Sequence, residues 1–283
     1  MHGQIVKAVG GKFDVKADGK KYVDCIIRGT AKRYRDIFVG DYCELSDGII
    51  TKIYDRKNEL IRPYVANIDV LIIVVAPVPV PDWTCVEKLI LNCRHQSITP
   101  AVLLNKCDLA DKDARERFLT PYKDHFTTFC VSAKTNEGIE ELKSFIKGKL
   151  VCFAGQSAVG KSSLINAIGG DNVEVGELSK KVARGKNTTR HVEIYDLAGG
   201  EVADTCGFTF ADNVDIKPEE LVYYYDEFLA YQNECRYNNC THTNEPGCAV
   251  KKAVEEKKLN EDRYFRYVAL YESLKEVWRT KYD

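Results

Sequence analysis

Short runs of strand-like composition, rich in apolar residues, follow one another through residues 1–62. Turns such as Gly10-Gly11 and Asp47-Gly48 separate them, and runs bounded in this way are typical of β-strands. About five strands in so short a segment predict a small closed barrel, most commonly the oligonucleotide-binding (OB) fold. The predicted strands include 4–9, 22–27, 41–45 and 49–54.

The pattern changes at residue 67, where apolar runs begin to alternate with amphipathic segments. The longest apolar run, 70–76, is far too short to span a bilayer, so a buried strand explains it better. Alternation of buried strands with helices predicts a mostly parallel sheet covered on both faces, and ligands of such sheets bind at the carboxyl ends of the strands. The predicted strands are 68–76, 101–104, 126–131 and 150–154, and the predicted helices are 86–93, 138–146 and 163–168.

A glycine-bearing segment between a predicted strand and a predicted helix has the sequence context of a phosphate-binding P-loop. Its backbone amides and the helix N-terminus can surround phosphate groups. Lys161 is expected to neutralise the β- and γ-phosphates, and the hydroxyl of Ser162 to bind Mg²⁺. The predicted phosphate-binding residues are Gly155, Gln156, Ser157, Ala158, Val159, Gly160, Lys161, Ser162 and Ser163.

Two further motifs at strand ends indicate that the base is guanine. Asn105-Lys106-Cys107-Asp108 follows one predicted strand, and Asp108 can accept hydrogen bonds from N1–H and the 2-amino group of guanine. Adenine has no such pair of donors, so a buried Asp108 would be left unpaired and would select against ATP. Asn105 can donate to the base, and the stem of Lys106 can cover its face. Ser132-Ala133-Lys134 follows the next strand, where a backbone amide can reach the guanine O6.

Residues around a predicted hairpin, 191–197 and 200–203, complete the set of GTPase motifs. After the hairpin, Asp204 is expected to hold Mg²⁺ through water, and the amide of Gly207 to contact the γ-phosphate. Before it, either Thr188 or Thr189 is the expected switch I ligand of Mg²⁺. An ordinary G domain begins with the P-loop, so these motifs run in circularly permuted order. Permutation can preserve the site because domain termini usually lie close together.

Three cysteines and one histidine crowd together near the C-terminus: Cys235, Cys240, His242 and Cys248. Three thiolates and an imidazole form a closed tetrahedral set for Zn²⁺, so we expect a structural rather than a catalytic metal. Such a small, loop-rich element needs the metal to fold. Helices are predicted at 249–257 and 262–281, and the aromatic residues of the second are more typical of packing than of RNA stacking.

Composition places the chain among globular proteins, with 45% hydrophobic and 29% charged residues. The N-terminus lacks an export signal, so the cytosol is the expected compartment. We expect eight of the 11 cysteines to be reduced, mostly buried thiols. Residues 1–62 hold 13 Lys and Arg against 9 Asp and Glu. Lys32, Arg33 and Arg35 beside Tyr34 fit either a nucleic-acid-facing loop or a merely solvated one.

The permuted motif order, the GKNTTR segment before DTCGF, and the Cys-x4-Cys-x-His-x5-Cys spacing resemble the small ribosomal subunit biogenesis GTPases of bacteria, the RsgA or YjeQ type. The resemblance covers essentially the whole chain. It implies an OB-fold, RNA-binding domain at 1–62, a circularly permuted α/β P-loop GTPase domain at 63–217, and a zinc-binding helical domain at 218–283. It also implies GTP hydrolysis stimulated by the small ribosomal (30S) subunit, during late maturation beside 16S rRNA.

Four positions depart from the usual GTPase pattern. Relatives usually have Gly at Ala158 and Pro at Cys206, and they often have His at Asn187. Phe208 stands where many GTPases have a water-orienting Gln. Because a phenyl ring cannot orient water, intrinsic turnover should be slow. An alternative is an RNA-binding module that uses GTP as a clamp with negligible turnover, and a third is nucleotide-gated docking on a protein partner. We expect a monomer, no membrane association, and GTP or GDP, Mg²⁺ and one structural Zn²⁺ as ligands.

Overall fold

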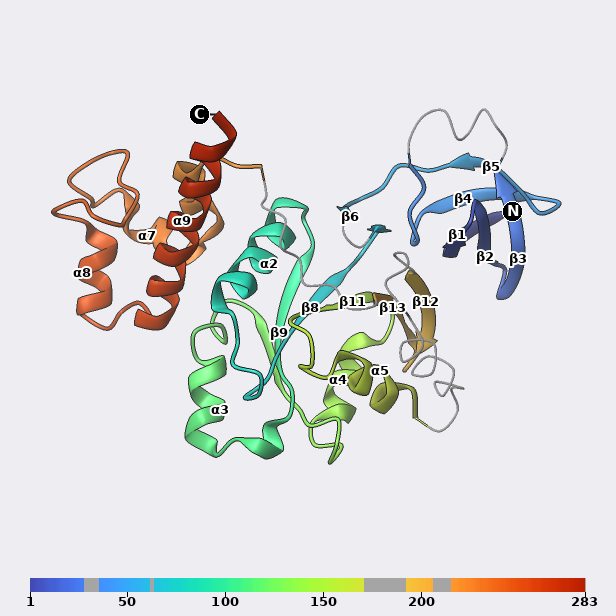
Figure 1. The fold of residues 1–283 in the computed structure, drawn as a ribbon, viewed down its shortest axis with the longest axis horizontal. Helices are drawn as coiled ribbons and strands as arrows, with labels where there is room; N and C mark the ends of the chain where they lie inside the picture. The colour runs from blue at the N-terminus through green and yellow to red at the C-terminus, as the bar shows by residue number, and fades with distance from the viewer. Residues whose placement is uncertain (28–35, 62–63, 171–191, 206–214, 283) are drawn as a thin grey trace.

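The computed structural model describes residues 1–27, 36–61, 64–170, 192–205 and 215–282. Figure 1 shows a β-barrel at one end of the molecule, an α/β region in the middle and a group of helices at the other end. This arrangement confirms the predicted multidomain fold class. Among the described helices, none combines the length and the apolar composition that crossing a bilayer demands.

Five strands form the N-terminal barrel. β1 pairs antiparallel with both β2 and β4. β2 pairs antiparallel with β3, β4 pairs antiparallel with β5, and β5 pairs in parallel with β3, so the five strands form a closed circle. Side chains of a strand point alternately to its two faces, and one set, including Ile5, Val15, Leu45 and Ile50, fills the interior. The OB-type barrel is confirmed, although β2 was not among the strands read from composition. The strands are β1 (His2–Val9), β2 (Lys12–Ala17), β3 (Lys20–Ile27), β4 (Tyr42–Ser46) and β5 (Ile49–Ile53).

The central sheet has five parallel strands in the order β10-β9-β8-β11-β13, followed by β12, which forms an antiparallel hairpin with β13. The predicted parallel sheet and the predicted hairpin are both confirmed. Because all five strands run the same way, the loops that follow them meet at one edge. The strands are β8 (Val70–Val75), β9 (Thr99–Leu104), β10 (Thr127–Cys130), β11 (Leu150–Ala154), β12 (Val192–Leu197) and β13 (Gly200–Thr205).

Helices cover both faces of this sheet, which is why β8 and β11 are apolar at every position. In β8, Leu71, Ile73 and Val75 pack toward α2, whereas Val70 and Ile72 pack toward α4 and α5. Helix α3 has no buried residue and a largely polar sequence, so its hydrophobic pattern is too weak to predict it. The helices are α2 (Trp83–His95), α3 (Lys112–Leu119), α4 (Ile139–Ile146), α5 (Lys161–Gly169) and the 3₁₀ turn η1 (Cys107–Leu109).

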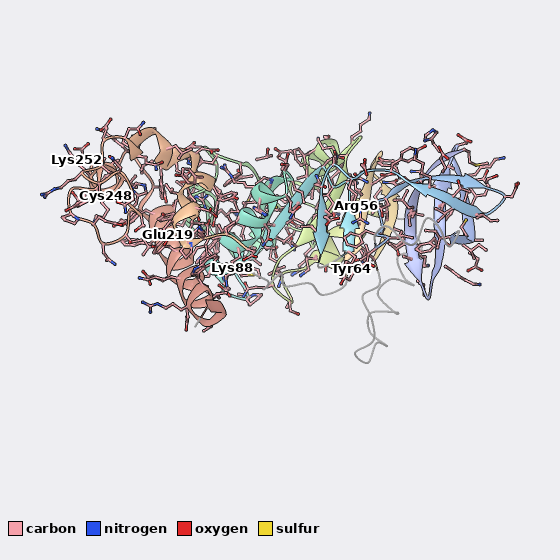
Figure 2. All side chains as sticks on the ribbon, turned by 90° about the horizontal axis from the view of Figure 1, so that it is seen from above. Arg56, Tyr64, Lys88, Glu219, Cys248 and Lys252 are labelled. Carbon is pink, nitrogen blue, oxygen red and sulfur yellow. The ribbon has the colours of Figure 1, made fainter. Side chains whose placement is uncertain are left out.

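A two-stranded sheet, β6 (Glu59–Ile61) with β7 (Tyr64–Ala66), lies between the barrel and the central sheet, and Figure 2 labels Arg56 and Tyr64 there. The Nε of Arg56 donates to Asp41 Oδ1 at 2.7 Å, and its guanidinium carbon lies 3.8 Å from the centre of the Phe38 ring. This buried contact anchors the connecting segment to the barrel.

Lysines of the barrel hold the β12–β13 hairpin against it. Lys7 and Lys21 pair with Glu193 at 3.0 and 3.3 Å, and Lys16 pairs with Glu201 at 3.0 Å. Three cations of the basic N-terminal segment are therefore paired with the neighbouring hairpin. The remaining basic cluster, Lys32 to Arg35, lies outside the described residues.

The C-terminal helices pack around a core of their own. Tyr264, Tyr267 and Tyr271 are buried in it, which confirms that these aromatic residues of the last helix serve packing, while Phe265 is 57% exposed. The predicted helices at 249–257 and 262–281 are found close to those bounds. The elements are η3 (Pro218–Tyr224), α7 (Asp226–Gln232), α8 (Ala249–Glu255) and α9 (Glu261–Tyr282).

A buried charge cluster joins these helices to the central domain, where α9 lies beside α2 in Figure 1. Arg263 of α9 pairs with Glu87 of α2, and both side chains are almost completely buried. The hydroxyls of Tyr122 and Tyr225 donate to the two oxygens of Glu87 at 2.8 and 2.7 Å. Arg263 also donates to Glu227 of α7 at 2.9 Å. The cluster thus connects four separate parts of the chain: α2, the segment that holds Tyr122, the segment from Tyr225 to Glu227, and α9.

Candidate nucleotide site and metal centre

The candidate phosphate loop is the backbone that joins β11 to α5. At Gly155, where φ is +142°, a Cβ atom would lie 2.3 Å from the carbonyl oxygen of Val74 in the neighbouring strand. At Gly160, where φ is +96°, a Cβ atom would lie 2.4 Å from Nδ2 of Asn105. Only glycine has neither the clash nor the strain at these two positions. The loop can therefore pass close to the neighbouring strand β8 and to the residue that follows β9.

Lys161, the first residue of α5, folds back over this loop. Its Nζ donates to the carbonyl oxygens of Gly155 at 2.6 Å and Gln156 at 2.8 Å. Burial lowers the pKa of Lys161, because the charged ammonium loses contact with water. The ammonium thus lies against the loop whose amides would surround phosphate, while Ser162 and Ser163 are exposed on the same helical turn.

Ala158 lies in the middle of the P-loop. Its φ is +65°, in the left-handed region that costs a non-glycine residue about 1–2 kcal/mol. The carbonyl of Ala158 accepts a hydrogen bond from Lys106 Nζ at 2.8 Å. This contact helps to hold the alanine in its left-handed conformation.

Asn105 connects three of the motif loops. It is 1% exposed, its Nδ2 donates to the carbonyl of Val159 at 2.8 Å, and its Oδ1 accepts from the amide of Ala133 at 3.2 Å. In this structure the amide group links the P-loop to the Ser132–Lys134 segment, and the predicted hydrogen bond from Asn105 to the base stays a prediction. Its observed role is to hold the loops in position.

The side chains expected around the base lie at the end of β9. Lys106 has a left-handed backbone, with φ of +57°, and its Nζ also donates to the carbonyl of Val78 at 2.9 Å. Asp108 is exposed, and its Oδ1 accepts from the hydroxyl of the fully buried Ser132 at 2.7 Å. The selectivity against ATP expected from the sequence requires a buried Asp108, so water must be excluded from this carboxylate by the bound base itself. Cys107 is buried beneath this loop.

Asp204 lies near the end of β13. Because β13 runs parallel to β11 with Ala203 opposite Cys152, Asp204 is brought to the level at which β11 ends and the P-loop begins. The remaining predicted residues of the switch segments, Thr188, Thr189 and Gly207, lie outside the described residues, as do Asn187, Cys206 and Phe208.

The three cysteines and the histidine predicted to bind zinc come together at the far end of the molecule, where Figure 2 labels Cys248. Their ligand atoms all lie within 4.8 Å of one another. Nδ1 of His242 lies 3.6 Å from Sγ of Cys235 and 3.4 Å from Sγ of Cys248. Zn–N and Zn–S bonds of about 2.1 and 2.3 Å at tetrahedral angles separate N from S by roughly 3.6 Å. The donor set therefore fits Zn²⁺.

Burial shifts the pKa values of the histidine and of Cys240 in this cluster in opposite directions. Burial lowers the pKa of His242, which favours the neutral imidazole that binds metals. Burial raises the pKa of Cys240 to about 12, so a bound cation has to displace the thiol proton. Backbone amides of Ala249 and Lys251 point to the sulfurs of Cys235 and Cys248 at 3.3 and 3.5 Å.

Comparison with known proteins identifies the family. A family model described as RsgA GTPase matches residues 53–213. The chain belongs to the RsgA GTPase family. The protein named small ribosomal subunit biogenesis GTPase RsgA from Caldanaerobacter subterraneus subsp. tengcongensis is 41% identical over 292 residues, covering 100% of this chain and 98% of that protein. The protein of the same name from Geobacillus sp. (strain WCH70) is 37% identical, with 97% of each chain covered.

Solved structures support the same assignment for this RsgA-family chain. The crystal structure of YjeQ from Thermotoga maritima is 34% identical, with a TM-score of 0.82, and covers 96% of this chain and 98% of its own. YloQ, described as a circularly permuted GTPase, is 31% identical, with a TM-score of 0.78, covering 97% and 95%. A solved structure that is similar to this chain over nearly its full length is thus itself described as a circularly permuted GTPase.

The RsgA-family site also involves a segment that carries no motif. The carbonyl of Val78 binds Lys106, and the amide of Asp82 donates to the Oε1 of Gln156 at 3.0 Å. Asp82 in turn caps α2 by accepting from Cys85 at 3.0 Å. Val78 contacts the Asn105–Asp108 loop and Asp82 contacts the P-loop through their backbone groups. A pattern of side chains in the sequence does not reveal such contacts.

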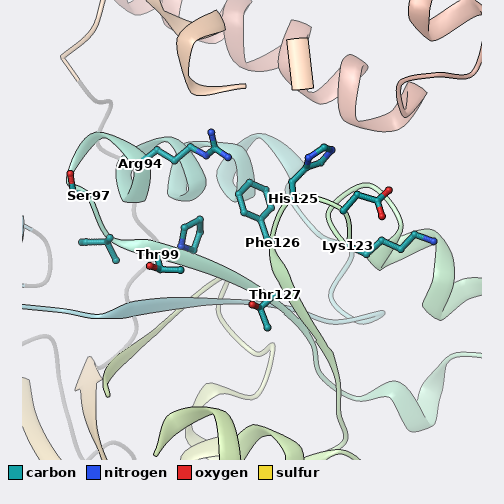
Figure 3. A pocket seen from close by; sticks show the side chains of 10 residues that line it. Arg94, Ser97, Thr99, Lys123, His125, Phe126 and Thr127 are labelled. Carbon is teal, nitrogen blue, oxygen red and sulfur yellow. The ribbon is translucent and has the colours of Figure 1, made fainter. Parts of the chain in front are cut away.

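A pocket of about 600 Å³ lies elsewhere on the central domain. Figure 3 shows its walls, which come from the end of α2, the start of β9 and the segment before β10. Because Thr99 and Thr127 are the first residues of their strands, the pocket lies at the amino ends of β9 and β10. It is thus remote from the loops that carry the nucleotide motifs, and we assign it no part in nucleotide binding.

Replacing Cys240 with Ser should remove one predicted zinc ligand and unfold the loop around it, because we expect the small C-terminal element to need the metal to fold. Zinc content measured by atomic absorption should fall below one ion per chain. The matched control is Cys130→Ser, which alters a half-buried cysteine of the central domain outside the cluster. A Cys240→Ser protein that retains a full equivalent of zinc would show that the ligand set is wrong.

Proposed function

We propose that this RsgA-family protein is a GTPase that binds the small ribosomal subunit and acts in its late maturation. The observation that supports this most directly is the convergence of the P-loop, the Asn105–Asp108 loop and the Ser132–Lys134 loop at one sheet edge, tied together through Asn105. The relatives with which the chain aligns over nearly its full length carry the name small ribosomal subunit biogenesis GTPase.

Each predicted site residue has a proposed role in this activity. Lys161 stabilises the charge that develops on the phosphates, and Ser162 and Asp204 hold the Mg²⁺ that bridges them. Thr188 or Thr189 completes the Mg²⁺ shell, and the amide of Gly207 contacts the γ-phosphate. Phe208 cannot orient the attacking water, so we propose slow intrinsic turnover that the 30S subunit stimulates. The proposed GTP contacts are residues 105–108, 132–134 and 155–163.

The three predicted domains are proposed to divide the work. The barrel, 1–62, binds RNA and lies beside 16S rRNA on the subunit; the permuted G domain, 63–217, binds and hydrolyses GTP. The C-terminal domain, 218–283, is held by one structural Zn²⁺ bound to Cys235, Cys240, His242 and Cys248. We propose that the protein is a cytoplasmic monomer.

Phosphate release from GTP and from ATP, with and without purified small subunits, tests this proposal. We expect a slow rate with GTP only, and a severalfold or larger rise when subunits are added. A flat rate combined with subunit binding that depends on a GTP analogue would favour the conformational clamp. No binding to subunits in either nucleotide state would contradict the proposed function.

Replacing Lys161 with Ala should abolish turnover, because no other group of the P-loop carries a positive charge to neutralise the phosphates. The measurement is single-turnover hydrolysis of radiolabelled GTP. Lys112→Ala, at an exposed position on α3, is the control and should hydrolyse GTP at the wild-type rate. Turnover retained by Lys161→Ala would place the activity elsewhere.

A further inference from the structure

The imidazole of His242 lacks the support that a zinc-bound histidine normally has. Such a ring usually donates its second N–H to a carboxylate, a carbonyl or water, which fixes its orientation. Here Nδ1 faces the sulfurs, and Nε2 is buried with no hydrogen-bond partner among the described residues. The Phe228 ring lies edge-on to the imidazole, with centroids 6.2 Å apart. The ring's orientation must therefore be set through the backbone that carries it.

That backbone is in an unfavourable conformation. His242 has a φ of +59°, in the left-handed region that side chains other than glycine rarely adopt. Such residues persist only where the surroundings hold them. The cluster therefore needs contacts that keep the 241–243 backbone in place.

Glu245 supplies three of these contacts. Its Oε1 accepts from the amide and the hydroxyl of Thr241 at 2.8 and 2.6 Å, and its Oε2 accepts from the amide of Thr243 at 3.1 Å. The carboxylate thus binds the residue on each side of His242 and leaves the imidazole to the metal. Hydrogen bonds to an ionised acceptor are stronger than those between neutral groups.

Helix α9 holds the carbonyl side of the same backbone. The hydroxyl of Tyr264 donates to the carbonyl of His242 at 2.9 Å, and that of Tyr267 donates to the carbonyl of Thr241 at 2.7 Å. Both tyrosines are buried. The amides of the loop are bound by Glu245 and its carbonyls by α9, so the peptide groups around the ligand are fixed from two directions.

We propose that Glu245 is a positioning residue of the zinc centre, which sets the geometry of His242 by holding the flanking amides rather than the ring. Its three hydrogen bonds go to Thr241 and Thr243 and not to the imidazole. An ordinary loop contact would contribute to local stability only, whereas this role predicts a specific loss of metal affinity.

The test measures zinc affinity of the full-length protein by competition with a chromophoric chelator. Glu245→Ala removes all three acceptor contacts, and we expect affinity to fall by roughly 10- to 100-fold, the range found when outer-shell partners of metal ligands are removed. Glu245→Gln retains one carbonyl oxygen but turns an NH₂ group toward the amide of Thr243, so its loss should be smaller than that of Ala.

Thr243→Ala is the control within the same loop, because it deletes a hydroxyl that contacts the Thr241 hydroxyl at 2.9 Å but keeps all three groups that Glu245 binds. It should retain wild-type affinity. The absorption spectrum of the Co²⁺-substituted protein provides a second readout: if His242 is misplaced, the ligand-field bands of Glu245→Gln should shift, even if Glu245→Ala fails to fold.

Wild-type affinity and an unchanged cobalt spectrum in Glu245→Gln, together with wild-type affinity in a folded Glu245→Ala, would overturn the proposal. So would an equal loss in Thr243→Ala, since that would make the effect one of general loop stability. A wild-type protein that binds no zinc would overturn the metal centre and this role with it. None of these outcomes depends on ribosome binding or on GTP turnover.

Discussion

Replacing Asp108 with Asn is expected to convert this GTP-binding protein into one that prefers xanthosine triphosphate. The carboxylate would accept from both N1–H and the 2-amino group of guanine. An asparagine retains one acceptor but turns a donor toward the 2-amino group, which leaves two donors facing each other. Xanthine carries an oxygen at that position and can accept from the asparagine amide. The affinity for GTP should fall by roughly 10⁴-fold, the discrimination reached by sites built around substrate hydrogen bonds.

The measurement is equilibrium binding of fluorescent GTP and XTP analogues to the two proteins. Asp113→Asn provides the matched control, because Asp113 is an exposed aspartate of α3, and it should bind both nucleotides like the wild type. Unchanged GTP affinity in Asp108→Asn would show that this carboxylate does not read the base.

Replacing Arg263 with Leu is expected to destabilise the contact between α9 and the central domain by about 3–5 kcal/mol, the usual result of breaking a buried ion pair from one side. Glu87 is fully buried and would lose its charged partner, keeping only the hydroxyls of Tyr122 and Tyr225. Glu227 would lose its donor as well. The C-terminal helices should then unfold at a lower denaturant concentration than the central domain.

Urea denaturation followed by circular dichroism and by zinc release would detect that separation. The control is Lys258→Ala, which removes an exposed cation paired with Glu256 at 2.6 Å and should leave the midpoint unchanged. If Arg263→Leu unfolds at the wild-type midpoint, the buried cluster contributes little to holding the domains together.

Several features of this protein were accessible from the sequence because they depend on local spacing. The run from Val70 to Val75 is apolar at every position, which predicts a strand covered on both faces wherever it lies in the sheet. The zinc ligands lie within one short segment, so chain geometry alone brings them near one another. Likewise, the P-loop was recognisable since its glycines, Lys161 and Ser162 are adjacent in sequence.

Other features were decided only by the tertiary structure. Glu87 and Arg263 are 176 positions apart, and Lys16 and Glu201 are 185 positions apart. Periodicity shows which face of an element is buried, but it does not specify which distant side chain will meet that face. The sequence predicted that Asn105 donates to the base, but only the tertiary structure shows that its amide also links two other loops. The proposed role of Glu245 could not be predicted from the sequence for the same reason. It depends on a left-handed backbone at His242 and on tyrosines from α9, a helix that begins at Glu261.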